Sequence, residues 1–321
     1  EAARNAVYER HGSQTPSQHT SFVGNIMASR IAALWDFSGP AFTVSAGDQS
    51  VFRVMDIAQQ MLSLGEVDAV VVGGVDFAGG MENILLRQSE NAFATTPNPS
   101  MIYDEKMNGI LPGEGAGAIV LKRKTADKNP AYAEINGSGS FAEADQLGYI
   151  ELAAKNSNGL EIAALDGKLN QNKRTALGSV TSNIGHTYAA SGIAGLIKTM
   201  LCLHHKFIPG TPNWTAPKDR QKIEGAYIPD TARPWVQDTN RQAGVSDGVG
   251  KLWLLEEASV AKKSNGKFSN NRFPVLLPIQ FSDIADARQK LSTLEEELEL
   301  SSDLKSISQS YFNHYKKGNF D

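Results

Sequence analysis

The chain has 321 residues, of which 41% are hydrophobic and 21% charged, a composition typical of a globular protein large enough for a substantial core. Its formal net charge of −4 gives no electrostatic case for nucleic acid or an anionic membrane, and no apolar run reaches transmembrane length. The single cysteine, Cys202, excludes an intrachain disulfide framework and fits a reducing compartment, so we expect a cytoplasmic protein whose partners include neither membrane nor nucleic acid.

The first elements expected along the chain include a strand, a tight turn and a helix. A helix is predicted over 23–36, and a buried strand is predicted at 42–44, where the residues are aromatic or β-branched. Small residues then predict a sharp turn around Asp48. The apolar residues within 51–64 suit a largely buried helix that follows this turn.

Asp48 is expected at the N-cap or in the first turn of that helix, where backbone N–H groups and the helix dipole favour an anion. A cysteine at such a position would have a lowered thiol pKa and could act as a nucleophile. An aspartate there is a stabilised carboxylate and a poor acyl acceptor. The local pattern leaves open whether Asp48 is a simple helix cap or stands at a reactive turn.

Two further strands and a glycine-rich segment follow. The run 67–75 is continuously apolar and rich in β-branched residues, which is typical of a strand covered on both faces. Residues 115–121 predict another strand. The glycines of 113–117 precede that strand and do not connect a strand to a helix, so we interpret them as a close strand approach and not as a phosphate-binding loop.

The second half of the chain repeats the unit of strand, polar turn and small-residue helix, which suggests an internally duplicated α/β fold. A strand over 175–181 leads through His186 to a helix over 189–204. The other expected elements are a strand at 132–136, a helix at 161–165, and closing strands at 243–246 and 252–255.

His186 stands between a glycine and a threonine, just before the small-residue helix. A histidine placed in this way could point into a cleft and donate to a developing oxyanion. A buried, hydrogen-bonded structural histidine fits the local pattern equally well. The six histidines and one cysteine show no zinc-type spacing, so no bound metal is expected, and Cys202 lies in an apolar pattern typical of a core residue.

The composition changes after Glu257. A polar linker at 261–271 leads to a charged tail over 283–316 that is predicted to be helical. We interpret the acidic run of this tail as a solvated face. The sequence therefore predicts one domain over 1–258, followed by a linker and helical tail over 259–321.

Several segments together resemble the β-ketoacyl synthases, whose fold is thiolase-like. They are Gly24–Ala32 through Val44, Asp68–Val75, Tyr103 and Asp104 with Gly113–Gly117, Ser182–Thr187 through Pro209, and Ala243–Ser246 with Leu255–Ala258. The resemblance spans 20–258 and implies a layered αβαβα fold with duplicated halves. Compared with the family pattern, the chain lacks the first strands and helices and is expected to be truncated at its N-terminus.

In this family, a cysteine at the strand–helix turn takes an acyl chain from the phosphopantetheine thiol of a carrier protein. Two histidines and a lysine then assist decarboxylation and condensation. The resemblance places Asp48 at the cysteine position, with Gln49 there in a register shifted by one residue. It places Thr181 at the lysine position and Ala153 at the first histidine, and His186 is the retained second histidine. The implied site is catalytically degenerate.

This pattern resembles a chain-length factor domain of a polyunsaturated fatty acid or polyketide synthase. We therefore expect a subunit or domain that is not an enzyme by itself, pairs with an active ketosynthase homologue in an acyltransferase complex, and shapes acyl chain length. The resemblance implies no bound cofactor. Its implied partners are an acyl carrier protein, whose phosphopantetheine arm carries the substrate, and other domains of a multidomain synthase.

Two alternatives remain open at the level of sequence. One is decarboxylase-type or residual acyltransferase activity on malonyl- or acyl-carrier protein, with His186 and Asp48 or Gln49 polarising the thioester. The other is a structural scaffold that docks the carrier protein and neighbouring domains through the tail.

Overall fold

The computed structural model describes residues 23–77, 79–90, 92–96, 100–101, 103–124, 130–154, 160–170, 174–218, 224–237, 239–259, 276–300 and 304–314. The contacts within the chain divide it into two compact units, which are 1–233 with 241–261, and 234–240 with 262–321. Across the described residues, no helix is both long and apolar enough to cross a membrane. The domain boundary expected at 258 stays a prediction.

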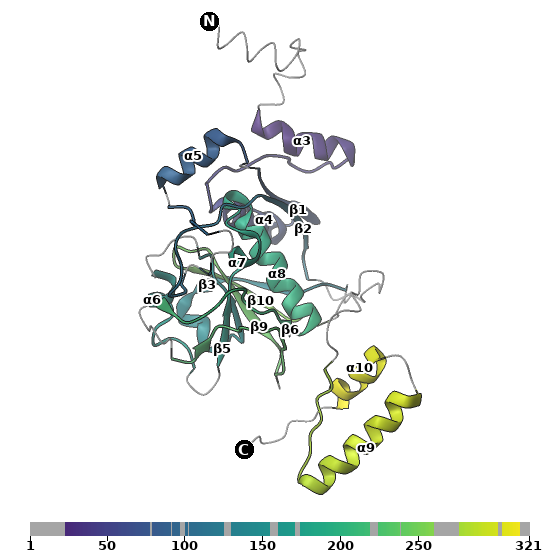
Figure 1. Ribbon diagram of the computed structural model, residues 1–321. Helices are drawn as coiled ribbons and strands as arrows, with labels where there is room; N and C mark the ends of the chain where they lie inside the picture. Colours follow the sequence, from purple (N-terminus) through teal and green to yellow (C-terminus); the bar gives the residue numbers. More distant parts are fainter. Residues whose placement is uncertain are drawn as a thin grey trace, which may run out of the picture. The chain divides into compact units, whose positions relative to one another are not determined.

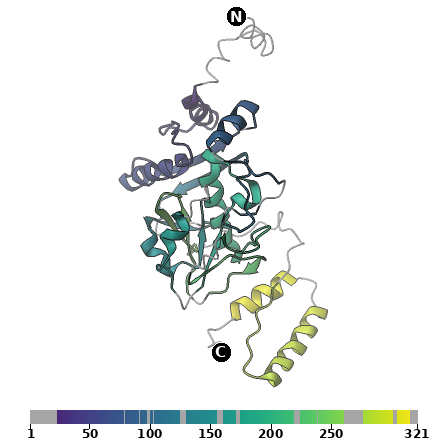
Figure 2. The ribbon, with the colours of Figure 1, turned by 60° about the vertical axis from the view of Figure 1, so that its left-hand side comes forward.

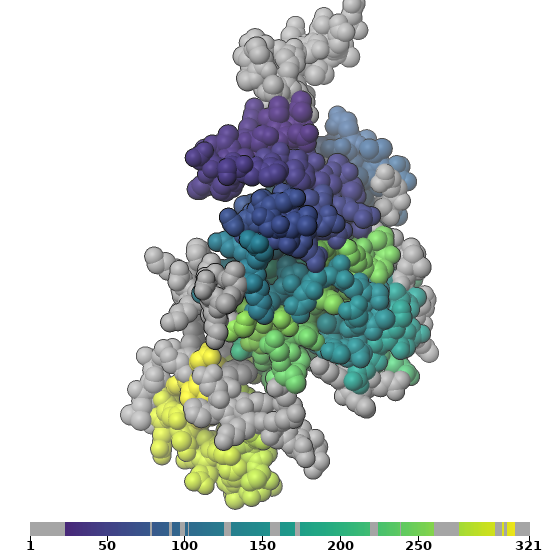
Figure 3. Space-filling model, turned by 180° about the vertical axis from the view of Figure 1, so that it is seen from behind, coloured from purple at the N-terminus to yellow at the C-terminus, as the bar shows by residue number. Residues whose placement is uncertain are grey.

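The first unit begins with helices and a two-stranded sheet (Figure 1). Helices α3 (Gly24–Leu34) and α4 (Ser50–Leu64) confirm the two helices expected there, and α5 (Met81–Glu90) follows later. Strand β1 (Ala69–Asp76) pairs antiparallel with β2 (Gly115–Lys122). Helix α3, purple in Figure 3, lies at the surface and buries none of its residues, whereas α4 buries an apolar face.

The predicted buried strand at 42–44 is wrong. This segment belongs to no strand, and Phe42 is exposed. A strand requires a neighbour that completes its hydrogen-bond ladder. Here the N–H and the hydroxyl of Thr43 instead donate to Oδ1 of Asn25, at 3.3 and 2.8 Å.

The expectation that 67–75 is covered on both faces is also wrong. Strand β1 overlaps this run from Ala69 onward, but its sheet has only two strands among the described residues. Val72 is fully buried, whereas Val71 and Val75 stay exposed. A continuous apolar run shows that a strand can be buried, but the neighbours that bury it come from elsewhere in the fold.

The larger sheet of the first unit has the strand order β3-β10-β9-β4-β5-β7. Its centre is β4 (Tyr149–Glu151), which runs parallel to β5 (Thr175–Gly178) and β9 (Gln242–Ser246). Strand β10 (Lys251–Glu256) pairs antiparallel with β9 and with β3 (Glu134–Ser140), so the two expected closing strands are confirmed. The remaining short elements are η1 (Phe141–Gln146), α6 (Leu160–Leu165), α7 (Thr181–Ile184), η2 (Tyr188–Ala190), β6 (Phe207–Ile208), β7 (Ala226–Tyr227) and β8 (Arg233–Pro234).

Helix α8 (Ser191–His205) confirms the predicted small-residue helix and contacts both the β1–β2 sheet and the six-stranded sheet (Figure 2). A Cβ atom on Gly74 of β1 would lie 2.9 Å from Cγ2 of Ile193 in α8. On the other side, a Cβ atom on Gly195 of α8 would lie 3.2 Å from Cγ of Glu151 in β4. Glycines therefore permit the close layering that brings the ends of α4, β4 and α8 together.

The second unit contains α9 (Ile284–Leu300) and α10 (Leu304–His314), which confirm the helical tendency of the tail. The two helices contact each other, and Leu294 and Ile307 are their buried apolar side chains. The hydroxyl of Ser308 donates to the carbonyl of Leu276 at 2.7 Å. The predicted linker at 261–271 lies outside the described residues.

Candidate functional site

The turn before α4 is built around a glycine and a serine. Gly47 has φ +56°, a conformation that suits glycine. The Ser50 hydroxyl donates to the carbonyl of Gly47 at 2.6 Å and accepts the N–H of Ala46 at 2.9 Å. Gln49 is the N-cap of α4, and no side chain caps the helix. The expectation that Asp48 caps this helix is therefore wrong, because Asp48 lies one residue before the N-cap position.

His186 is held by main-chain pairing just after Gly185, whose φ is +79°. The His186 N–H donates to the carbonyl of Leu111 at 2.7 Å, and its carbonyl accepts the N–H of Gly113 at 2.9 Å. A Cβ atom on Gly113 would clash with the backbone just before His186. The glycine-rich segment thus lets two backbones approach closely, as the sequence indicated, and this contact fixes the histidine loop.

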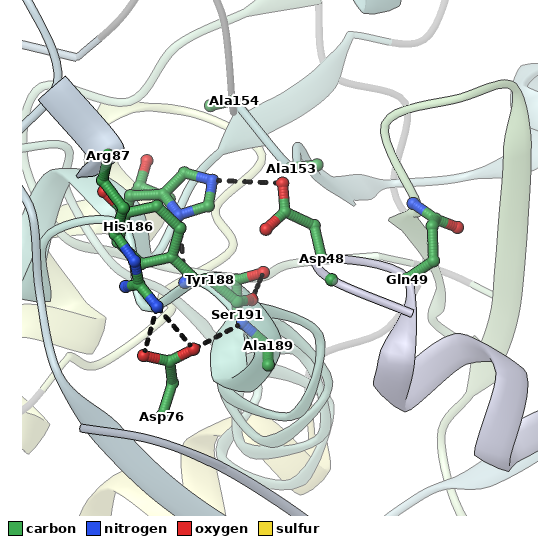
Figure 4. A network of polar contacts seen from close by, with 12 residues as sticks. Asp48, Gln49, Asp76, Arg87, Ala153, Ala154, His186, Tyr188, Ala189 and Ser191 are labelled. Carbon is green, nitrogen blue, oxygen red and sulfur yellow. Dashed lines mark hydrogen bonds and ion pairs between the residues drawn. The ribbon is translucent and has the colours of Figure 1, made fainter. Parts of the chain in front are cut away.

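The imidazole ring of His186 is oriented by its own loop. Its side chain is only 4% exposed, and Nδ1 accepts the N–H of Tyr188 at 3.0 Å. A neutral imidazole whose Nδ1 accepts carries its proton on Nε2. This Nε2 lies 3.8 Å from Oδ2 of Asp48, a separation longer than a hydrogen bond (Figure 4).

The neighbouring residue Gln49 points elsewhere. Its Nε2 donates to the carbonyl of Asp247 at 2.6 Å, across 198 positions of sequence. Figure 4 shows the two side chains on different sides of the turn, with Asp48 toward His186. Asp48, and not Gln49, therefore faces the histidine.

Ala153 lies two residues after the end of β4 and is labelled in Figure 4. The Ala153 and Ala154 N–H groups donate to the Glu161 carboxylate, at 2.9 and 2.8 Å. That carboxylate also accepts the hydroxyls of Tyr103 and Ser246. Burial, reinforced by the charge of Glu161, raises the pKa of Tyr103, which therefore stays a neutral donor. Glu161 thus holds the backbone at the Ala153 position, a role that the sequence did not indicate.

Thr181 is the first residue of α7, in the turn that leads to His186. Its hydroxyl lies 2.8 Å from the hydroxyl of Ser179, and its carbonyl accepts the N–H of Gly185. The Thr181 side chain is therefore a neutral part of the turn and brings no positive charge to it.

A charged network beside His186 was not indicated by the sequence. Nη2 of Arg87 lies 3.0 and 3.2 Å from the carboxylate oxygens of Asp76, and its guanidinium lies 3.5 Å from the ring centroid of Tyr188. Asp76 also accepts the N–H of Ala189 at 3.3 Å (Figure 4). No short motif could have revealed this network, because its residues come from β1, α5 and η2 and meet only in the folded chain.

Chemically, the site offers a histidine N–H donor and an aspartate carboxylate that face each other. The N–H suits a carbonyl oxygen or an oxyanion, whereas a carboxylate is a poor acyl acceptor. Within the part of the chain that the structure describes, no cluster of three His, Cys, Asp or Glu residues could hold a metal ion.

Two family models match this chain. The beta-ketoacyl synthase N-terminal domain matches residues 2–127, and the beta-ketoacyl synthase C-terminal domain matches residues 132–215. One subunit of the polyunsaturated fatty acid synthase of Thraustochytrium sp. is 33% identical over 88% of this chain. Polyketide synthase PksL of Bacillus subtilis is 28% identical over 86% of it. The chain spans only 16% and 7% of the lengths of these two relatives.

Solved structures give a consistent result. The ketosynthase from module 6 of the bacillaene synthase of Bacillus subtilis matches with a TM-score of 0.64 and 29% identity, over 77% of this chain and 53% of that one. A point mutant of the same ketosynthase matches with a TM-score of 0.67 and 26% identity, over 90% of this chain and 57% of that one.

Proposed function

The chain belongs to the β-ketoacyl synthase family, and from this premise we propose that it is a synthase-like subunit or domain that does not condense acyl groups itself. It pairs with an active ketosynthase and shapes the length of the acyl chain in polyunsaturated fatty acid or polyketide biosynthesis. Its other partners are an acyl carrier protein, whose phosphopantetheine arm carries the substrate, and the remaining domains of a multidomain synthase.

The fold that carries this proposal is the one expected from the sequence. The match to ketosynthase structures confirms the layered, thiolase-like α/β arrangement. In this fold the turn before α4 and the loop before α8 meet, and these two segments supply Asp48 and His186.

The observation that supports the loss of condensing chemistry is the position of Asp48, whose carboxylate lies 3.8 Å from Nε2 of His186. Acyl transfer from a carrier protein requires a nucleophile that can form a thioester, and a carboxylate cannot do so. Restoring a thiol would leave the site incomplete. Ala153 and Thr181 stand where the family resemblance implies a histidine and a lysine.

The direct test is the Asp48→Cys variant, incubated with acyl- and malonyl-carrier protein without any partner. We expect no condensation product by mass spectrometry, even if the new thiol accepts an acyl group. Gln49→Cys is the matched control, because its side chain faces Asp247 and not His186. Condensation by Asp48→Cys alone would contradict the proposal.

The role in chain length requires a second measurement. An active ketosynthase domain from the same synthase is assayed with and without this chain, and the lengths of the products are compared. We expect this chain to form a complex with the ketosynthase and to change the distribution of product lengths. A complex with an unchanged distribution would instead support the scaffold alternative.

A second candidate function is decarboxylation of malonyl-carrier protein, and the tautomer of His186 favours it. With Nδ1 accepting from Tyr188, the neutral imidazole carries its proton on Nε2, the atom that would donate to the enolate oxygen that forms when carbon dioxide leaves. We expect His186→Ala to abolish any release of carbon dioxide above background. Asp48→Asn keeps the size of the side chain and removes the negative charge opposite the histidine, so under this function it should preserve or raise the rate. No release by the unaltered protein would reject this second function.

A further inference from the structure

Helix α9 presents an apolar stripe that is exposed in the described part of the second unit. Ile284, Leu291 and Leu298 recur at seven-residue intervals and are 75%, 50% and 36% exposed. Seven residues correspond to nearly two helical turns, so these side chains lie on one face. The stripe is distinct from the adjacent side of α9, where Leu294 is buried.

Two opposite charges border this stripe. Arg288 and Glu295 are also seven residues apart and exposed, and neither forms an ion pair with another described residue. They lie about 10 Å apart along the helix axis, so they cannot pair with each other within one helix. Farther round the helix, by contrast, Lys290 is engaged, because its Nζ lies 2.8 Å from both the Asp286 carboxylate and the Gln280 carbonyl.

We propose that α9 pairs antiparallel with α9 of a second copy of this chain, about a two-fold axis near Leu291. In this arrangement Arg288 lies opposite Glu295 of the partner subunit, and the symmetry repeats the contact. Ile284 then lies near Leu298 of the partner subunit, so the whole stripe is buried. The surface is complementary to itself in both charge and apolar pattern, as a two-fold interface requires.

The order of the charges selects this orientation. In a parallel pair each residue lies at the same height as its own counterpart, so Arg288 and Glu295 of the partner subunit would stay about 10 Å apart. The antiparallel pair brings them to the same height. The helix is only about 25 Å long, so the pairing is expected to be weak by itself. It involves only the second unit and does not rest on the proposed function.

The first test is chemical cross-linking of the full chain carrying Leu291→Cys, with a short bis-maleimide. We expect covalent dimers, because residue 291 lies near the proposed two-fold axis. Thr293→Cys is the matched control, since position 293 is exposed on the opposite face of the same helix, and we expect no dimer above background there. The native Cys202 is buried and contributes no background.

The second test exchanges the charges in chains that retain Leu291→Cys. Arg288→Glu should lower the yield of cross-linked dimer, in line with roughly tenfold weaker pairing. Adding Glu295→Arg should restore the yield, because the opposite charges then meet again. Glu296→Lys is the control, since it changes the net charge by the same two units but in the opposite sense and away from the stripe.

Four outcomes would overturn the proposal. Equal cross-linking at positions 291 and 293 would show random collision. Failure of the double charge exchange to restore dimers would reject the antiparallel register. A Leu291→Cys thiol that reacts with a monofunctional maleimide but never cross-links would show that the stripe is open or binds another protein. A Leu291→Cys thiol that does not react at all would show that this chain covers the stripe.

Discussion

Lys198 and Glu151 form a buried ion pair, with Nζ and Oε2 3.0 Å apart and side chains 15% and 3% exposed. The Glu151 carboxylate also accepts the hydroxyl of Tyr149 and the N–H of Val180. This one carboxylate therefore connects α8, the end of β4 and the turn that leads to His186. It lies where the segments that carry Ala153 and Thr181 leave strands β4 and β5.

Removing one partner of this pair should destabilise the protein strongly. Lys198→Met leaves a buried carboxylate without its cation, and we expect the free energy of unfolding to fall by about 3–5 kcal/mol. Urea unfolding followed by circular dichroism measures this change. The double variant Lys198→Met with Glu151→Gln should recover much of the loss, because no buried charge then remains unpaired.

The ion pair between Lys251 and Asp56 is the control for this experiment. Its atoms are 2.6 Å apart, but its side chains are 35% and 30% exposed. Lys251→Met should therefore change the free energy of unfolding by no more than about 1 kcal/mol. Equal losses for Lys198→Met and Lys251→Met would contradict the role that we assign to burial.

The Cys202 thiol should be unreactive in the folded protein. Burial raises its pKa to about 12, against a smaller opposing effect of Lys198. The thiol is therefore neutral near pH 8, and only a thiolate is an effective nucleophile. We expect no reaction with a disulfide reagent such as Ellman's reagent until urea unfolds the chain, when one thiol should appear. Rapid, complete labelling of the folded protein would show that Cys202 is accessible.

Stability should decrease in acid through Glu257. Burial disfavours its charge, but hydrogen bonds from Lys206 and Arg241 outweigh burial and lower its pKa below the ordinary 4.5. A group with a lowered folded pKa contributes stability above its unfolded pKa and loses that contribution as the pH falls through the folded value. Glu257 should thus stabilise the fold at neutral pH and lose this effect below pH 4.5.

The measurement compares urea unfolding of the unaltered protein and of Glu257→Gln between pH 7 and pH 3. The variant should be less stable at pH 7, and the difference between the two proteins should shrink as the pH falls below 4.5. A difference that stays constant with pH would show that packing of the side chain, and not its charge, accounts for the loss.

Most of the fold could be predicted from local patterns, because the apolar residues of α4, α8 and β10 are the ones that these elements bury. The prediction of a strand at 42–44 was wrong because a strand needs a neighbouring strand, which a local pattern does not reveal. Thr43 instead donates a hydrogen bond to the side chain of Asn25. The exposure of Val71 and Val75 has the same cause. An apolar run indicates which side chains a strand can bury, but not which other elements of the fold cover them.

The candidate site was predictable in part for a related reason. The sequence could place Asp48 and Gln49 at a turn, but neighbouring residues in a turn point their side chains in different directions. Gln49 contacts Asp247, which lies 198 positions away in the sequence, so the direction of its side chain is not a local property. The role of Glu161 and the network of Arg87 with Asp76 and Tyr188 depend equally on distant segments.

Two adjacent glycines of β1 should respond in opposite ways to an added methyl group. A Cβ atom on Gly74 would lie 2.8 Å from Cγ2 of Val51 and 2.9 Å from Cγ2 of Ile193, where α4 and α8 pack on the strand. Gly74→Ala should therefore lower the free energy of unfolding by about 1–3 kcal/mol through overpacking.

A Cβ atom on Gly73 would meet only the carbonyl of Gly117 at 3.7 Å, an ordinary contact. Because alanine costs less backbone entropy than glycine, Gly73→Ala should be neutral or stabilising by up to about 1 kcal/mol. Urea unfolding of the two variants side by side measures the difference, and equal stabilities would show that the helices do not press on the strand at Gly74.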